Sequence, residues 1–559
     1  MESSLRRKDR SRDPSLPKGR QVGDEALEHV AGILGSLPRR RDLLIEALHL
    51  IQDHDGHLSA ANLAALAELF RLAQAEVYEV ASFYHHFDVV REGETPPPPV
   101  TIRVCDGLSC EMAGAKGLIE SLRAEIDPAR IRVQAVPCIG GCDMAPAAQC
   151  GKRSVGRASA AALLRAAADP QEPVIPDYQG LEAYRYAGGY ASLKRVLSGD
   201  ISAETAIEVM SDAQLRGLGG AGFPAGRKWS LVRAENGPRL MTVNGDEGEP
   251  GTFKDRYWLE REPHRLLEGA LIAAHVVGCD RIYIYMRDEY PAVREILARE
   301  IDALEAAGLL STPMELRRGA GAYICGEESA MIESIEGKRG LPRHRPPYIA
   351  QVGLFGRPTL NHNVETLSWV ADILQNGAKW FADQGQDEAH SGLRSFSVSG
   401  RVKEPGVKLA PAGIPLNTLI AEHCGGMADG HEFRAFLPGG ASGGVFPASM
   451  ADLPLNFGVF EPYGGFIGSH AIVILSQQDR VADAVLNTMR FFRDESCGQC
   501  TPCRSGTDKI VRLLEAGNAD PALLDDLGLV MRDSSICGLG QAASNCVRHL
   551  LKYFPEETS

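Results

Sequence analysis

Residues 216–229 read RGLGGAGFPAGRKW, with five glycines among fourteen residues and Lys228 near the end. Glycine lets backbone amides approach a ligand closely and adopt positive φ. A run of such amides beside a lysine is typical of a phosphate-binding loop. Gly217, Gly219 and Gly222 also satisfy G-x-G-x-x-G. That fingerprint should follow a strand, whereas the preceding ETAIEVMSDAQLR has helical spacing. Taken alone, the stretch is equally compatible with a surface glycine loop.

The central part of the chain contains two more glycine loops, NGDEGEPGTFKD at 244–255 and GAGAYICGEES at 319–329. Around them, strand-like runs such as RIYIYMR alternate with helix-length runs such as PHRLLEGALIAAHVVG. This alternation predicts a mostly parallel sheet with helices on both faces. Ligands of such sheets bind beyond the carboxyl ends of the strands. The sequence therefore predicts a Rossmann-like ligand-binding domain over residues 201–392, with the three loops at one edge.

The composition is that of a globular protein, with 559 residues, 44% apolar residues and 24% charged residues. The net charge of −14 argues against a nucleic-acid partner, which requires a basic face. No apolar run approaches the ~20 residues that cross a bilayer, so we expect no membrane span. Residues 1–25 are basic and lack the apolar core of a secretory signal. We interpret them as a disordered arm, either a solvated tail or a docking arm, and expect a cytoplasmic protein.

Eight of the thirteen cysteines fall into two tight sets. Clustered cysteines in a large chain without an export signal indicate metal ligands rather than disulfides. The first set is Cys105, Cys110, Cys138 and Cys142, in an α/β unit over residues 100–170. Each pair follows a strand-like run, and four thiolates that converge from loops suit a two-iron cluster. Structural zinc and a catalytic dithiol remain alternatives.

The second set begins in SCGQCTPCRSG with Cys497, Cys500 and Cys503, and Cys537 follows thirty-four residues later in SSICGLG. A triplet with a distant fourth cysteine indicates a four-iron cluster, because one tight loop can hold three iron corners and a remote thiolate the last. Zinc ribbons use C-x2-C pairs instead. Cys546 is a rival for the fourth position, but Cys537 lies in the glycine-flanked turn that suits a ligand.

The remaining segments predict a multidomain protein. Apolar residues at three- and four-residue spacing predict a helical bundle over residues 26–95. Residues 171–200 are expected to form a linker with one helix, ASLKRVLS. Short strand-like runs around one helix predict a small β-rich domain over residues 393–480, and its loop LPGGASGG is interpreted as structural turns rather than a second ligand site. Residues 481–559 are expected to be helical.

Several motifs together resemble the flavoprotein subunit of respiratory complex I. They are RGLGGAGFPAGRKW, NGDEGEPGTFKDR, GAGAYICGEESAMIESIEGKRGLPR, NVET at Asn363 and CGQCTPCRSG…SICGLG. This subunit type also occurs as the diaphorase of NAD-reducing hydrogenases and of NAD-dependent formate dehydrogenases. The upstream ASFYHHF, CDGLSC and CIGGCDMAP resemble the family's thioredoxin-like two-iron subunit, so the two subunits are fused here. SVSGRVKEPGVKLAPAG and LPGGASGGVFPASM look most like the β subunit of a molybdenum- or tungsten-containing formate dehydrogenase.

The resemblance implies the α/β multidomain fold and its cofactors. The expected order is the helical bundle with a thioredoxin-like [2Fe-2S] domain, the Rossmann-like FMN domain, a β-grasp-like domain and a C-terminal helical bundle with a [4Fe-4S] cluster. FMN and NAD are the expected organic cofactors.

The resemblance also implies a set of binding residues. Gly217, Gly219 and Lys228 match the cradle for the FMN phosphate and ribityl chain. The matches to polar flavin contacts are Asn244, Asp246, Glu247, Tyr323, Gly326, Glu327, Asn363 and Thr366. The matches to NAD(H) contacts are Gly220, Phe223, Glu249 and Glu328. The departures from the family pattern are Arg345 and Tyr348 in place of Lys and Phe, His362 in place of the first Asn of NNVET, and Leu231 in place of an aromatic residue.

The implied activity is that of a diaphorase. NADH transfers two electrons as a hydride, whereas iron–sulfur clusters accept one at a time, and a flavin can do both. No protein acid or base need carry the hydride, so we name no catalytic residue. We expect a molybdenum or tungsten formate dehydrogenase α subunit as partner, since nothing in the chain resembles a molybdopterin site. The alternatives are a hydrogenase or complex I partner and, more distantly, a non-enzymatic zinc scaffold.

Overall fold

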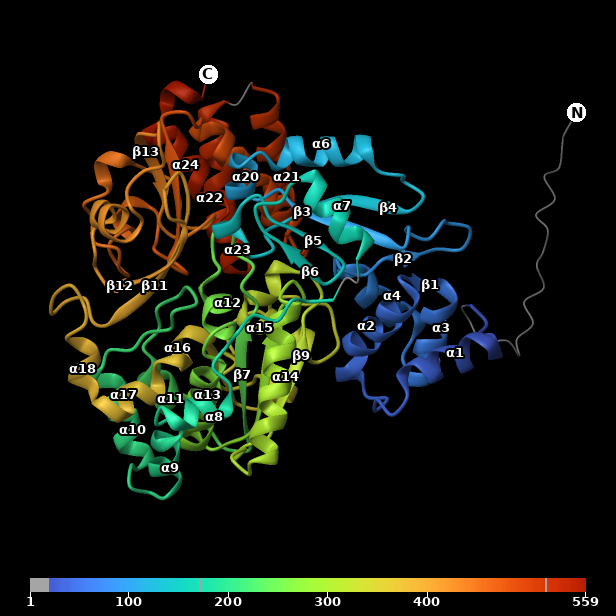
Figure 1. Cartoon of the computed structure of the whole chain (residues 1–559), viewed down its shortest axis with the longest axis horizontal. Coiled ribbons are helices and arrows are strands. Elements are labelled where there is room, and N and C mark those ends of the chain that lie inside the picture. Colours follow the sequence, from blue (N-terminus) through green and yellow to red (C-terminus); the bar gives the residue numbers. More distant parts are fainter. Residues whose placement is uncertain (1–19, 170–171, 518–519, 559) are drawn as a thin grey trace, which may run out of the picture. The chain divides into compact units, whose positions relative to one another are not determined.

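The computed structural model describes residues 20–169, 172–517 and 520–558. The disordered arm predicted for residues 1–25 therefore lies mostly outside the described residues. Its predicted end is wrong, because helix α1 begins at Asp24, directly after Gly23 (Figure 1). The chain divides into two compact units, Met1–Pro97 and Pro98–Ser559.

The first unit contains the predicted helical bundle. Side-chain hydrogen bonds support the starts of two of its helices, α3 and α4, and satisfy backbone amides there. The Ser59 hydroxyl accepts the Asn62 amide at 3.1 Å, and Glu76 Oε2 accepts the Ala73 amide at 3.1 Å. The elements are α1 (Asp24–Leu34), α2 (Leu44–Asp55), α3 (Ala60–Phe70), α4 (Gln74–Phe83) and a short parallel pair, β1 (Leu58–Ser59) with β2 (Val89–Val90).

The second unit starts with a four-stranded sheet in the order β4-β3-β5-β6. The first two strands are parallel and the last two antiparallel, as expected for a thioredoxin-like domain. Its core includes Ile102, Val104 and Leu122, all fully buried. The elements are β3 (Val100–Cys105), α5 (Leu108–Met112), α6 (Ala115–Glu125), β4 (Ile131–Val136), β5 (Ala148–Cys150), β6 (Arg153–Val155) and α7 (Ala160–Ala168).

The central sheet has the order β10-β7-β8-β9, and all its pairings are parallel, as predicted. Helix α13 is apolar almost all round and is buried as a result. It begins with Pro263 in its first turn and ends before Gly278, whose φ of 76° terminates it. The elements are α10 (Ala203–Asp212), α11 (Ala225–Ala234), β7 (Arg239–Gly245), α12 (Lys254–Leu259), α13 (Pro263–Val277), β8 (Cys279–Met286), α14 (Pro291–Ala306), β9 (Met314–Arg318), α15 (Glu328–Ile335), β10 (Thr359–Asn363), α16 (Val364–Ser368), α17 (Val370–Asn376) and α18 (Ala378–Ala382).

The strand order creates a switch point beside β7. From β7 the chain crosses over to β8 on one side, whereas β10 pairs with β7 on the other side. The register places Asn363 opposite Asn244, so the ends of β10 and β7 lie side by side. Ligands of open parallel sheets bind at such a point.

The segment 171–200 is not the linker that we predicted. It contains two helices, α8 (Leu181–Tyr186) and α9 (Ala191–Leu197), and their apolar side chains belong to the core of the central domain. Buried Glu268 on α13 fixes this segment, because its carboxylate accepts the Tyr184 hydroxyl at 2.7 Å and the Tyr190 amide at 2.9 Å. The predicted helix ASLKRVLS corresponds to α9, whereas α8 was missed because it is only six residues long.

The third sheet has the order β12-β11-β15-β13-β14. Its two central strands, β11 and β15, are parallel and the outer pairings are antiparallel, which is the expected β-grasp-like arrangement. The predicted helix begins as α19 (Leu416–Thr418) and continues as a wider π-type turn over Leu419–His423. The strands are β11 (Leu393–Gly400), β12 (Gly406–Pro411), β13 (Phe433–Leu437), β14 (Phe446–Pro447) and β15 (Ala471–Ser476).

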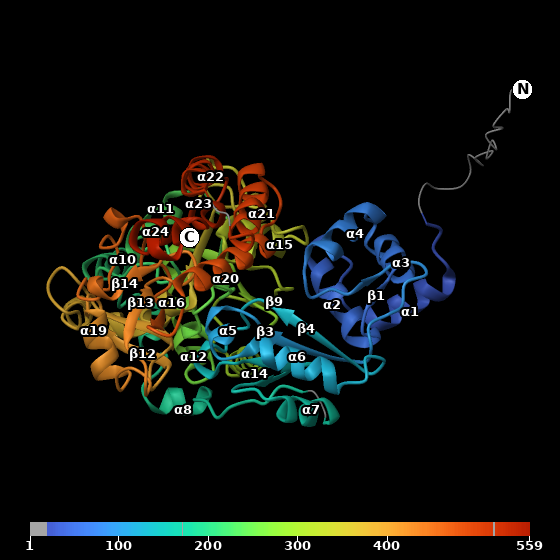
Figure 2. The ribbon, with the colours of Figure 1, turned by 90° about the horizontal axis from the view of Figure 1, so that it is seen from above.

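The C-terminal helices gather on one side of the second unit, where Figure 2 shows them in red. Helix α20 is amphipathic and buries Val485, Thr488 and Phe492 on one face. The helices are α20 (Val481–Asp494), α21 (Thr501–Glu515), α22 (Pro521–Ser534), α23 (Gly538–Ala542) and α24 (Asn545–Tyr553).

Candidate functional site

A cavity of about 730 Å³ opens at the carboxyl ends of β7 and β10. Its walls come from the central domain, the β-grasp-like domain and the first turn of α23. Ten of the fifteen predicted cofactor-binding residues line it: Gly219, Gly220, Asn244, Asp246, Glu247, Glu249, Tyr323, Gly326, Glu327 and Asn363. The three glycine loops therefore meet at one site, as the alternation of strands and helices predicted.

The glycine-dense loop connects α10 to α11, so it follows a helix and not a strand. It closes on itself, because the Gly217 amide donates to the Phe223 carbonyl at 2.8 Å. A Cβ at Gly219 would lie 2.9 Å from the Cβ of Asn363, so only glycine allows the loop to approach β10. The Leu218 amide donates to Thr366 Oγ1 at 2.8 Å. Thr366 thus supports the loop from behind without lining the cavity.

Lys228 lies on α11, outside the lining of the cavity. Its ammonium donates to the Asn361 carbonyl on β10 at 3.1 Å. Burial lowers the pKa of Lys228, because the charged form loses its hydration, although Glu328 partly opposes this shift. The ring centre of Phe223 lies 5.9 Å from the Lys228 ammonium, and Phe223 is 36% exposed. The structure therefore does not place Lys228 in the cavity lining, and its phosphate role stays a prediction.

The acidic loop after β7 is held by its own hydrogen bonds. The Asn244 side chain donates to the Gly326 carbonyl at 2.8 Å and accepts the Asp246 amide at 3.0 Å. Glu249 Oε1 accepts the Ser442 amide at 2.7 Å, and its other oxygen accepts the Tyr323 hydroxyl. These bonds join the loops of the central domain to the β-grasp-like domain.

Asp246 indicates which kind of ligand fits the cavity. Its Oδ2 is buried and has no hydrogen-bond partner among the described residues. Burial raises the pKa of this carboxyl well above its usual value, with Arg287 acting in the opposite direction. A buried polar atom without a partner is costly. The donor groups of a flavin ring or ribityl chain would satisfy it, so the cavity fits FMN.

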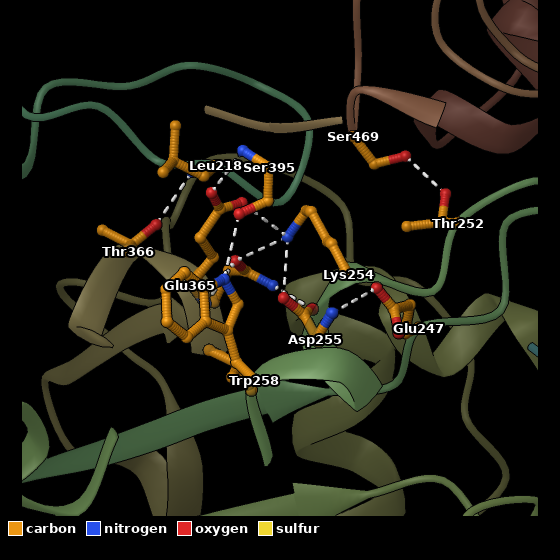
Figure 3. Close-up of polar contacts among 12 residues, drawn as sticks. Leu218, Glu247, Thr252, Lys254, Asp255, Trp258, Glu365, Thr366, Ser395 and Ser469 are labelled. Carbon is orange, nitrogen blue, oxygen red and sulfur yellow. Dashed lines mark hydrogen bonds and ion pairs between the residues drawn. The ribbon is translucent and has the colours of Figure 1, made fainter. Parts of the chain in front are cut away.

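A buried ion-pair network surrounds Lys254, which lines the cavity (Figure 3). Lys254 is fully buried, and its ammonium lies 2.7 Å from Asp255 Oδ1 and 3.1 Å from Glu365 Oε2. It also donates to Asn363 Oδ1 at 3.3 Å, while the Asn363 Nδ2 donates to Asp255 Oδ2 at 2.6 Å. The side-chain oxygen and nitrogen of Asn363 therefore both have hydrogen-bond partners. Lys254 and Asp255 line the cavity but were missed, because nothing in NGDEGEPGTFKD signals which charges are buried.

The third loop uses its acidic residues mainly for its own structure. Glu327 Oε2 accepts the amides of Ser329 and Ala330 at 3.0 and 2.9 Å and so caps α15. Arg345, one of the departures from the family pattern, pairs with Glu327 and lies 3.1 Å from Glu328 Oε1. Glu328 does not line the cavity.

The other departures lie away from the cavity lining. His362 is buried and accepts the indole N–H of Trp229 at 2.8 Å. Burial holds its pKa well below the usual value, so it is a neutral core residue. Leu231 and Tyr348 are 48% and 55% exposed.

The prediction for the loop LPGGASGG was incomplete. Gly439 and Ser442 line the same cavity, so the loop is part of the first site and not only a set of turns. Phe457, Phe466 and Ser469 of the β-grasp-like domain were missed altogether. No local pattern distinguishes them, because their domain docks onto the cavity only in three dimensions.

The first cysteine set converges in the thioredoxin-like domain. Cys105, Cys110, Cys138 and Cys142 are all buried and none forms a disulfide. The thiols of Cys138 and Cys142 lie 3.3 Å apart. The amides of Gly140 and Ala147 donate to the thiols of Cys138 and Cys110, both at 3.4 Å. Thiols surrounded by amide donors suit an iron–sulfur cluster, whose potential such hydrogen bonds tune.

The second set lies beside the starts of α21 and α23. Cys500 and Cys537 directly precede these helices. A Cβ at Gly540 would lie 2.9 Å from the Cβ of Cys503, so the Cys537 turn packs against the triplet. The Cys546 thiol instead donates to the Ala441 carbonyl at 3.3 Å. The arrangement favours Cys537 over Cys546 as the fourth ligand.

Neither set is arranged as a mononuclear zinc site. Thiolates on one zinc ion would lie about 3.8 Å apart, given Zn–S bonds of about 2.3 Å. Within residues 20–169, 172–517 and 520–558, three His, Cys, Asp or Glu ligand atoms lie mutually within 4.8 Å only at His29, His54 and Asp55. That group is an ion-pair cluster in the first unit, where both histidines and Asn62 contact the Asp55 carboxylate. Among the described residues, neither cysteine set therefore brings three thiols mutually within 4.8 Å.

Three family models match successive parts of the chain. Residues 30–169 match the thioredoxin-like [2Fe-2S] ferredoxin, residues 210–372 the Nuo51 FMN-binding domain, and residues 483–559 the NADH-ubiquinone oxidoreductase-F iron-sulfur binding region. Together with the site, they define the class of protein: an NAD(H)-dependent oxidoreductase subunit that carries FMN, a [2Fe-2S] cluster and a [4Fe-4S] cluster.

Curated relatives identify the family. The F 2 subunit of NADH-quinone oxidoreductase from Rhizobium meliloti is 39% identical over 399 residues, which cover 68% of this chain and 94% of that relative. The F subunit of the same enzyme from Aquifex aeolicus is 39% identical over 397 residues, which cover 68% of this chain and 91% of the relative. The chain belongs to this flavoprotein-subunit family of NADH-quinone oxidoreductase, which is complex I.

A solved structure resembles almost the whole chain. A chain in the crystal structure of an air-oxidized NAD+-reducing [NiFe]-hydrogenase superposes with a TM-score of 0.81 and 35% identity, covering 93% of both chains. Among the described residues, no helix is both long and apolar enough to cross a membrane.

Proposed function

We propose that the chain is the diaphorase (β) subunit of an NAD-dependent formate dehydrogenase, which reduces NAD+ with electrons from a molybdenum or tungsten α subunit. The observation that carries the diaphorase part is the cavity. Its lining joins the FMN-binding loops to Gly538 and Leu539, which directly follow Cys537. The formate assignment rests on SVSGRVKEPGVKLAPAG and LPGGASGGVFPASM. We place the complex in the cytoplasm.

Different residues of the chain would hold the flavin and the nicotinamide nucleotide. FMN, when bound, exchanges two electrons with the nicotinamide and single electrons with the clusters. Asp246 would hold the flavin through its buried Oδ2, which has no partner among the described residues. Asn244 and Asn363 position the cavity wall through their contacts with the Gly326 carbonyl, Lys254 and Asp255. Glu249 and Gly220 bind NAD(H), and an acidic residue near the ribose favours NAD over NADP. Phe457 and Phe466 of the β-grasp-like domain line the cavity and would keep water away from bound FMN and NAD(H).

The cluster ligands are also part of the proposal. We assign Cys105, Cys110, Cys138 and Cys142 to the two-iron cluster. We assign Cys497, Cys500, Cys503 and Cys537 to the four-iron cluster. Their burial and amide donors support the first assignment, and the packing of Gly540 against Cys503 supports the second.

A hydrogenase diaphorase is the second candidate. The chain in the NAD+-reducing hydrogenase structure covers the same two-iron, flavin and four-iron regions, with 93% coverage in both directions. The complex I relative from Rhizobium meliloti covers only 68% of this chain, so a fused architecture favours the hydrogenase-type subunit over a separate complex I subunit. The local chemistry is the same in both cases.

The test is anaerobic purification of the native complex, followed by metal analysis and two assays, formate:NAD+ and H2:NAD+. Molybdenum or tungsten with formate-dependent NADH formation is expected. Nickel with hydrogen-dependent NADH formation would replace the formate assignment by the hydrogenase one. Absence of NADH:dye activity in flavin- and iron-loaded chain would overturn the diaphorase proposal itself.

A further inference from the structure

A buried arginine bridges the two-iron loop and the acidic loop of the cavity. Arg287 directly follows β8 and is 4% exposed. Its Nη2 donates to the Cys138 carbonyl at 2.7 Å, and its Nη1 donates to the Glu247 carbonyl. One guanidinium thus contacts a proposed cluster ligand and a residue of the cavity lining, in a region away from solvent.

The contact is part of a built interface between the two domains. The ring of Tyr290 lies so close to the two-iron loop that a Cβ at Gly140 would be 2.0 Å from its hydroxyl. The Tyr290 hydroxyl donates to Glu247 Oε2 at 3.0 Å. Arg256 donates to the Gly140 carbonyl at 3.1 Å and pairs with Asp143 at 2.8 Å. The two-iron loop is therefore fixed to the central domain, and the charge of Arg287 stays beside it.

A fixed cation at this place changes the energy of cluster reduction. Reduction adds one electron to the cluster, so a nearby positive charge stabilises the reduced state more than the oxidised state. The low dielectric of a buried site strengthens this effect. Glu289 opposes it, because its carboxylate lies 2.9 Å from Arg287 Nη2. The Glu289 carboxylate pairs with Arg287, whereas Arg287 contacts the Cys138 backbone directly.

We propose that Arg287 is a positioning residue that raises the reduction potential of the two-iron cluster and couples that site to the flavin cavity. The Glu289 carboxylate lowers this potential, because it partly cancels the charge of Arg287. The inference rests on the proposed cysteine assignment. It does not depend on whether the partner oxidises formate or hydrogen.

The experiment is a redox titration of the as-purified complex, with dithionite and mediator dyes and detection of the two-iron signal by EPR. For Arg287→Met, the ratio of reduced to oxidised two-iron cluster at the wild-type midpoint should fall at least tenfold, which corresponds to 59 mV for one electron. For Glu289→Gln, the ratio should rise. Arg287→Lys keeps the charge and should remain nearer the wild type than Arg287→Met. The four-iron signal serves as the internal control and should not move.

Several results would overturn the inference. One is an unchanged potential in Arg287→Met with full signal intensity, and another is a shift of both variants in the same direction. If Arg287→Met fails to fold, the titration of Glu289→Gln tests the proposal instead. An unchanged two-iron potential in Glu289→Gln then rejects the proposal. A wild-type complex without a two-iron signal would overturn both the cysteine assignment and this inference. Because dithionite supplies the electrons, a failure of the formate assignment leaves the titration unaffected.

Discussion

Replacement of Lys254 by methionine should strongly destabilise the folded chain. The ammonium is fully buried and lies 2.7 Å from Asp255 and 3.1 Å from Glu365. Burial alone disfavours the charged form, but the carboxylates of Asp255 and Glu365 outweigh it and raise the pKa of Lys254. Methionine has a similar length and no charge, so Lys254→Met leaves the carboxylates without their cation. Removal of one partner of a buried pair costs about 3–5 kcal/mol.

The cost should be recovered in part by a second substitution. Glu365 is fully buried, and its Oε1 accepts the Ser395 amide at 2.9 Å. Glutamine keeps that acceptor and removes the charge, so Lys254→Met with Glu365→Gln should regain about 1–3 kcal/mol relative to Lys254→Met. The matched control is Lys379→Met. Lys379 forms an ion pair of similar length, 2.8 Å, but its side chain is 86% exposed, so its loss should change stability little because solvent screens an exposed pair.

The assay is urea unfolding under anaerobic conditions, followed by tryptophan fluorescence, with all variants at the same flavin and iron loading because ligands stabilise the folded state. With a slope of about 3 kcal/mol per molar urea, the midpoint of Lys254→Met should fall by roughly 1–1.7 M. The FMN dissociation constant should also rise, since Asn363 loses its Lys254 contact. A loss no larger than that of Lys379→Met, or no recovery in the double variant, would refute the ion-pair argument.

Three further predictions concern single groups. Lys228→Ala should lose FMN while it retains iron, and an unchanged flavin-to-iron ratio would contradict the proposed phosphate role. Cys537→Ser should lose roughly four iron atoms and the four-iron EPR signal, whereas Cys546→Ser should keep both, and the reverse result would exchange the two cysteines. Burial and the neighbouring carboxylate of Asp255 raise the pKa of Glu247 to about 7 from 4.5. The stability that protonated Glu247 contributes is thus fully present below pH 4.5 and is lost as the pH rises through about 7. In the flavin-free chain, Glu247→Gln should remove about 3 kcal/mol of this pH dependence of the unfolding free energy. An unchanged pH profile of urea midpoints in Glu247→Gln would reject this prediction.

The sequence predicted those features that local constraints determine. Cysteine spacing is one such constraint, because a triplet such as Cys497, Cys500 and Cys503 can close only a small number of metal geometries. The alternation of strands and helices is another, and it placed the three glycine loops at one sheet edge. Both predictions follow from residues that are near each other in the chain.

Features that depend on distant residues were missed or displaced. Lys254 is buried because Glu365 and Asn363 arrive from β10 and α16, more than one hundred residues later. The helices of segment 171–200 are ordered by Glu268, which they meet only after folding. Lys228 was expected in the cavity, yet its ammonium is held by the Asn361 carbonyl. The glycine-rich motif predicted that a lysine lies near the loop, but not the direction in which its side chain points.

The contacts around the cavity explain why fused domains suit this chemistry. On the two-iron side, the acidic loop is bound through Glu247, whose carbonyl accepts from Arg287 and whose carboxylate accepts from Tyr290. On the four-iron side, the Tyr323 amide donates at 2.9 Å to Glu495, two residues before Cys497. Each cluster region therefore has its own attachment to the cavity wall, by different residues of different loops. Because the attachments are separate, the protein can adjust the electrostatics of one cluster without altering the other, which a shared loop would not permit.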